Sequence, residues 1–111
     1  MDAAAPDALY AEAMMLAAQA RAFFDPGGTG DGARAKLRPE SRLAVATESL
    51  RVTTRLLEIV SALIVRQAGR TPPERPRDMA PIPGRLGGPG REIVAGVRDL
   101  YLRTFAEGRP R

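Results

Sequence analysis

The chain has 111 residues, enough for one domain with a modest core, and its 17 basic and 13 acidic residues give a formal charge of +4. It contains no cysteine and no histidine, which excludes disulfides, thiolate metal sites and the commonest general base and metal ligand. The remaining carboxylates, hydroxyls and single lysine are not set in a recognisable catalytic spacing, so we predict a non-enzymatic protein without cofactor or metal.

No membrane segment is predicted. The stretch 1–7 is acidic and lacks the apolar core of a secretory signal. The longest apolar candidate, 56–65, is too short for a membrane span and contains Glu58. We therefore expect a cytoplasmic protein with no membrane partner.

The first helix is predicted at about 6–24, because Pro6 suits a first helical turn and apolar or small residues then recur at helical spacing. These residues are Leu9, Ala13, Leu16, Ala17, Ala20 and Phe23, and Tyr10 and Met14 widen the face. The glycine-rich stretch 25–37 is predicted to be a flexible connector. A phosphate-binding loop is not favoured, since a helix precedes the glycines and the GxxxxGK[ST] order is missing.

A long central helix is predicted at about 40–68, a stretch with no proline and no glycine. Large aliphatic residues recur at every seventh position, and we take them with one serine as candidates for dimer or core packing: Leu43, Leu50, Leu57, Ser61 and Ile64. A second apolar line consists of Val45, Val52, Leu56, Ile59 and Leu63. A helix that is apolar around most of its circumference should be packed on at least two sides, so we predict an all-α three-helix bundle that forms a homodimer.

The polar side of this central helix is narrow and consists of Glu48, Arg51, Arg55, Glu58 and Arg66. Two oppositely charged pairs are spaced i,i+3, and each such pair stabilises a helix by only a few tenths of a kcal/mol. We predict that the stripe is exposed. Our candidates for partner binding are Glu48, Arg51, Arg55 and Glu58, and the alternative is an ordinary solvated face.

The stretch 71–90 holds six prolines and four glycines, which predicts a mobile or partly extended linker. Fully extended it would reach roughly 60 Å, so its length leaves the direction of the next helix open. The third helix is predicted at about 91–107, with an apolar face formed by Ile93, Val94, Val97, Leu100, Tyr101, Thr104 and Phe105. No strand pattern is present in the sequence.

One block of the central helix, Glu-Ser-Leu-Arg-Val-Thr-Thr-Arg-Leu-Leu at 48–57, resembles the signature of the alphaproteobacterial RcdA family, the regulators of CtrA degradation. The residues that carry the resemblance are Glu48, Ser49, Arg51, Thr53, Thr54, Arg55, Leu56, Ser61 and Gln67. The family's tryptophan after the serine is replaced by Ala62. The resemblance implies a dimeric three-helix bundle that acts as an adaptor for the ClpXP protease.

Two functions follow as expectations. The first is an adaptor or scaffold in regulated proteolysis of the bacterial cell cycle, whose partners would be a second copy and a protease complex, response regulator or cargo. The alternative is a DNA-associated regulator that uses its scattered arginines for phosphate contacts. The long connectors do not fit a compact helix-turn-helix, so nucleic acid is not our leading partner.

Overall fold

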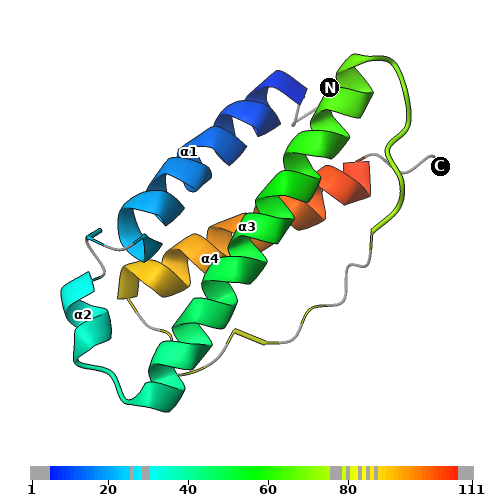
Figure 1. The fold of residues 1–111 in the computed structure, drawn as a ribbon. Coiled ribbons are helices and arrows are strands. Elements are labelled where there is room, and N and C mark those ends of the chain that lie inside the picture. Colours follow the sequence, from blue (N-terminus) through cyan, green and yellow to red (C-terminus); the bar gives the residue numbers. More distant parts are fainter. Residues whose placement is uncertain are drawn as a thin grey trace.

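The computed structural model describes residues 6–25, 27–28, 31–75, 79, 81–82, 84, 86 and 88–107. The helices are α1 (Pro6–Phe24), α2 (Asp31–Ala35), α3 (Pro39–Gln67) and α4 (Gly88–Glu107), and no strand occurs among the described residues. The three long helices pack against one another in all three pairings, with α3 as the longest rod (Figure 1). The predicted all-α bundle with a long central helix is confirmed.

Contacts at the helix ends fix the directions of the helices. Gln67, at the end of α3, donates a hydrogen bond from Nε2 to Oδ1 of Asp7, near the start of α1, over 3.2 Å, so these helices are antiparallel. Arg66 donates to the backbone carbonyl of Thr104 near the end of α4, so α3 and α4 run the same way. The segment between them therefore travels back along the length of the bundle (Figure 1).

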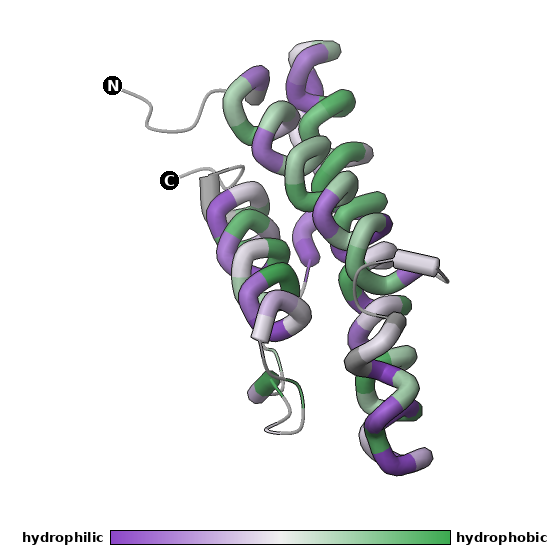
Figure 2. The backbone as a smooth tube through the Cα atoms, turned by 90° about the vertical axis from the view of Figure 1, so that its left-hand side faces the viewer, coloured by the Kyte–Doolittle hydropathy of each residue, from purple (hydrophilic) through white to green (hydrophobic). Residues whose placement is uncertain are grey.

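The core side of α3 is the second apolar line rather than the seven-residue repeat. The buried apolar residues of α3 are Val45, Val52, Leu56, Ile59, Ala62 and Leu63. Hydrophobic and hydrophilic residues alternate along each long helix, as amphipathic packing requires (Figure 2). Because α1 and α4 both dock on this one side, the opposite side of α3 is left uncovered by the residues that the structure describes.

The residues of the seven-residue repeat lie outside the core of the chain. Leu43, Leu50, Leu57 and Ile64 keep 69, 71, 65 and 55% of their surface exposed, and Ser61 is exposed as well. The alternative prediction, that these residues pack in the core, was therefore wrong for a single copy of the chain. Their role in a dimer stays a prediction.

The ends of α3 follow from local chemistry. Pro39 occupies the first turn, preceded by an extended Arg38 that makes no side-chain cap. At the other end Gly69 adopts φ 77°, and the N–H groups of Gly69 and Arg70 bond to the carbonyls of Arg66 and Val65. Both predicted bounds, 40 and 68, differ by one residue from the observed ones.

The described residues of the connectors include a short helix and positions packed on the core. The stretch 25–37 contains α2, and Nη1 of Arg34 donates to the carbonyl of Phe23 over 2.6 Å, which satisfies an acceptor at the end of α1. In the predicted linker 71–90, Pro72 and Leu86 are buried, and Met79 and Ile82 pack against the core. The helix predicted at 91 begins at Gly88, with Pro89 in its first turn. The described part of the linker is thus packed on the bundle.

Candidate interaction surfaces

The uncovered side of α3 carries no charge. We call it the outer face, and it consists of Leu43, Ala46, Thr47, Leu50, Thr53, Thr54, Leu57, Ser61 and Ile64. All of these residues are exposed except Thr47, which is half-buried. Contiguous exposed aliphatic surface of this kind marks an interaction site in most proteins.

The hydroxyl groups on the outer face are partly satisfied within the helix itself. Thr47 donates from Oγ1 to the carbonyl of Leu43 over 2.9 Å, and Thr53 donates to the carbonyl of Ser49 over 3.1 Å. Threonines bonded in this way need no water or partner group for those protons. The face can therefore be covered by an apolar surface without leaving these two donors unpaired.

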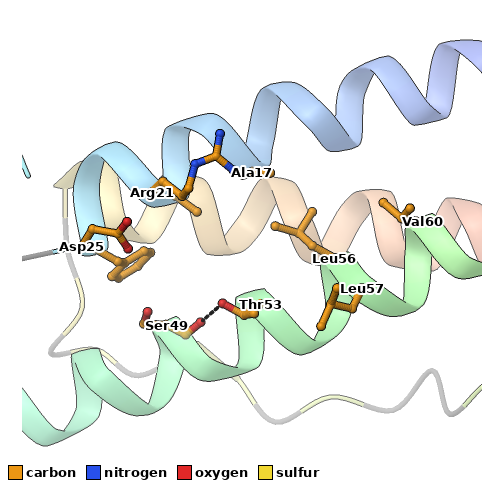
Figure 3. A pocket seen from close by; sticks show the side chains of 10 residues that line it. Ala17, Arg21, Asp25, Ser49, Thr53, Leu56, Leu57 and Val60 are labelled. Atoms are coloured by element: carbon orange, nitrogen blue, oxygen red, sulfur yellow. Dashed lines mark hydrogen bonds between the residues drawn. The ribbon is translucent and has the colours of Figure 1, made fainter.

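Beside the outer face lies a groove between α1 and α3, which we call the apolar groove (Figure 3). Its volume is about 310 Å³. It is lined by Ala17, Ala20, Arg21, Phe24, Asp25, Ser49, Thr53, Leu56, Leu57 and Val60. Thr53 and Leu57 belong both to this groove and to the outer face, so the two apolar surfaces are continuous.

The polar stripe of α3 was predicted to be exposed, but most of its residues do not face bulk solvent. Glu48 is 2% exposed, and Nη1 of Arg51 bonds to its Oε2 over 2.7 Å. Arg55 and Glu58 are half-buried, and Glu58 pairs with Arg75 of the linker over 3.6 Å. Of the four partner-binding candidates only Arg51 is exposed. The stripe turns toward α4 and the linker because these segments cover that flank of α3.

These residues border a second groove, which we call the arginine groove. It measures about 410 Å³ and is lined by Thr47, Leu50, Arg51, Thr54, Arg55, Glu58, Met79 and Tyr101. The sequence identified Arg51, Arg55 and Glu58 but missed Met79 and Tyr101, which the linker and α4 bring to the same place. Met79 and Tyr101 reach this groove because of the direction of α4 and the position of Met79 in the linker, which the sequence left open.

The electrostatics of the arginine groove are set by burial and by crowded guanidinium groups. Burial lowers the pKa of Arg55, and the positive charge of Arg98 on α4 lowers it further, while Glu48 opposes these effects. Burial raises the pKa of the Tyr101 hydroxyl, and the negative charge of Glu58 adds to this shift. The groove therefore keeps a neutral tyrosine beside an excess of arginine.

The described residues include no cluster of carboxylates able to hold a metal ion. Within the same residues, no helix has the length and apolar character to cross a bilayer. What the two surfaces offer is apolar contact on one side of α3 and charged contact on its flank.

Comparison of the chain with curated proteins and with solved structures finds no match. The model of a family described as "Protein of unknown function (DUF1465)" matches residues 1–73. That range covers α1, α2 and α3, and with them the outer face and most of the arginine groove. Since the match spans well over half of the 111 residues, the chain belongs to this family.

Proposed function

We propose that the protein is a non-enzymatic adaptor or scaffold that works as a homodimer, with the outer face of α3 as the surface between the two copies. The observation that supports this most directly is the exposure of Leu43, Leu50, Leu57 and Ile64, at 55–71% each, on a face without charges. Such a row of aliphatic side chains resembles the seam of a coiled coil that lacks its second helix.

The energy available from this face supports the dimer. Burying a fully exposed leucine contributes about 1.5–3 kcal/mol, so each of these partly exposed side chains would contribute about 1–2 kcal/mol. Two copies would bury eight of them, which amounts to about 8–16 kcal/mol. Association costs an estimated 4–15 kcal/mol in lost freedom, so the apolar gain is of the same size as this cost.

The pattern of the outer face favours an antiparallel pairing. Leu50 and Leu57 lie equally far from a point between Thr53 and Thr54, and so do Leu43 and Ile64. A two-fold axis through that point would place Leu50 of one copy opposite Leu57 of the partner subunit. The small threonines at the axis would let the two helices approach closely.

The absence of cysteine from the chain makes this arrangement directly measurable by disulfide formation. Thr54→Cys, next to the axis, should cross-link efficiently with itself under mild oxidation, whereas Leu43→Cys should not. A mixture of Leu50→Cys and Leu57→Cys chains should give the mixed dimer. Efficient self-linking of Leu43→Cys together with none at Thr54→Cys would contradict the antiparallel register.

The link to regulated proteolysis rests on the resemblance of residues 48–57 to the RcdA family. The test is the rate at which the ClpXP protease degrades a response regulator, measured with and without the purified protein. We expect the wild-type protein to accelerate degradation and Leu50→Lys, which removes self-association, to lose the effect. An unchanged rate in the presence of wild-type protein would exclude the proteolytic role while leaving the dimer intact.

The alternative, a DNA-associated regulator, receives less support from the contacts. Arg51, Arg75 and Arg103 are each engaged by a carboxylate, which reduces the positive charge available for phosphates. Duplex binding that weakens steeply with added salt would favour this alternative over the adaptor.

A further inference from the structure

The arginine groove carries more positive charge than its own carboxylates compensate. Arg51 and Arg55 of α3 line it, and Arg98 of α4 lies close enough for its charge to lower the pKa of Arg55. Glu48 is already bonded to Arg51 over 2.7 Å. Glu58, at the other edge, pairs with Arg75. Glu48 compensates the charge of Arg55 only in part, because burial and the nearby charges of Arg98 and Arg51 outweigh it.

Within the part of the chain that the structure describes, Arg55 lacks a hydrogen-bond partner at one nitrogen of its guanidinium group. Its Nη1 is buried and has no hydrogen-bond partner among the described residues, although the same side chain lines the open groove. Burying a charged donor without an acceptor is costly, and such groups are usually paired in native proteins. A negatively charged acceptor that enters the groove would compensate the charge excess around Arg55, and a rotation of the guanidinium group would bring a free N–H onto it.

The residues that line the groove restrict which kind of acceptor it can bind. Its volume of about 410 Å³ falls in the range of sites for small groups. Met79 and Tyr101 provide apolar surface, whereas Leu50 and Thr54 belong to the outer face as well. The nearby carboxylates of Glu48 and Glu58 oppose a doubly charged phosphate, whereas a singly charged carboxylate attached to an apolar residue suits both the charge and the walls.

We infer that the arginine groove binds a carboxylate carried by a peptide segment of a partner protein, either a C-terminal carboxylate or an Asp or Glu side chain. This inference rests on the proposed adaptor function and names the chemistry of the partner. The guanidinium groups of Arg55 and Arg98 hold the carboxylate, and Met79 and Tyr101 contact the residue next to it. Arg51 remains on Glu48.

The test is a titration of the full chain, followed by NMR, with short acetylated peptides of Ala and Leu. One peptide ends in a free carboxylate, one is amidated, and one is amidated but contains a single Glu. Inorganic phosphate is a fourth probe. We expect the first or the third peptide to shift the Nε–Hε signals of Arg55 and Arg98 with a Kd on the order of 1 mM, and the neutral peptide to leave them unchanged.

Three variants complete the test. Arg98→Gln and Arg55→Lys should each weaken carboxylate binding at least about tenfold, because a charged hydrogen bond or its bidentate geometry is lost. Arg42→Gln, which removes the same charge from an exposed position of α3 outside the groove, should not. Amide spectra of each variant establish that it is folded.

Equal binding of the neutral peptide, tighter binding of phosphate than of either carboxylate, or equal weakening by Arg42→Gln would each overturn the inference. Sedimentation of the same samples keeps this outcome separate from the proposed function. Loss of carboxylate binding in a protein that still self-associates rejects the groove alone. Binding of carboxylate by a monomer rejects the proposed dimer alone.

Discussion

At the scale of single residues, burial of Glu48 is the feature that most changes the interpretation of α3. The sequence places this glutamate in a polar stripe, yet its side chain is only 3% exposed and bonds to Arg51. A carboxylate in such a place acts as an internal counter-charge for the arginines around it. Glu48 therefore stabilises the protein by neutralising the charge of nearby arginines and not through contact with solvent.

Replacing Glu48 by Ala should lower the free energy of unfolding by about 3 kcal/mol, because the change leaves Arg51 and Arg55 without their buried counter-charge. Urea unfolding at a fixed protein concentration measures the effect. Glu40→Ala is the matched control, since Glu40 is exposed in the first turn of α3 and should contribute less than about 1 kcal/mol. Similar losses in the two variants would show that the pair with Arg51 contributes nothing special.

Tyr101 predicts a dependence of stability on alkaline pH. Its pKa is raised in the folded state, first by burial and then by Glu58, while Arg75 and Arg55 oppose the shift. The folded protein thus holds the proton more tightly than the unfolded chain. The resulting stabilisation is complete below the unfolded pKa of about 10 and is lost as the pH rises through the folded value.

Tyr101→Phe should remove this part of the pH dependence. Unfolding free energies measured by urea between about pH 8 and pH 11 should fall more steeply for the wild-type protein than for the variant above about pH 10. Parallel curves for the two proteins would mean that the tyrosine ionises as easily in the folded state as in the unfolded one.

At the scale of helices, α3 carries two apolar lines of similar strength, and only one enters the core. Periodicity alone could predict the helix, since its bounds and those of α1 follow from prolines, glycines and spacing. It could not predict which line α1 and α4 cover, because both lines are aliphatic and the choice depends on contacts between distant segments. Glu48 was misplaced for the same reason: its burial depends on what packs over that flank of α3.

The short α2 and the early start of α4 were missed for a different reason. Both contain glycine, which weakens a helical pattern in sequence. Tertiary contacts supply what local propensity lacks, through the bonds from Arg34 to the end of α1 and through the burial of Leu86 and Gly90. The arginine groove could not be predicted from the sequence either, because Tyr101 and Met79 reach it from segments whose course the sequence left open.

Substitutions of two adjacent leucines of α3 distinguish the roles of the two apolar lines by experiment. Leu56→Ala should lower the free energy of unfolding by about 2–5 kcal/mol, because Leu56 is buried in the core. Leu57→Lys should leave the helical circular dichroism unchanged and weaken self-association, because Leu57 lies on the outer face and is 65% exposed. A collapse of helix content in Leu57→Lys would show that the second line also supports the fold of one copy.

At the scale of the whole molecule, α1 and α4 cover one side of α3, and the described residues leave the other side open. In the described part of the linker, Arg75 pairs with Glu58 on the flank of α3 and so adds to the charged side. One apolar surface and one charged groove then lie on neighbouring sides of the same helix. This division suits a protein that pairs with itself through one surface and binds a partner through the other.

Sedimentation at micromolar concentration, with wild-type protein compared with Leu50→Lys, measures whether the outer face joins two copies of the chain. The wild-type protein should sediment with about twice the 11.9 kDa mass of one chain, because a second copy covers the outer face. Leu50→Lys should sediment as a folded monomer, since a charge at the centre of that face cannot be buried without a partner. A wild-type protein that stays at 11.9 kDa across this concentration range would contradict the account.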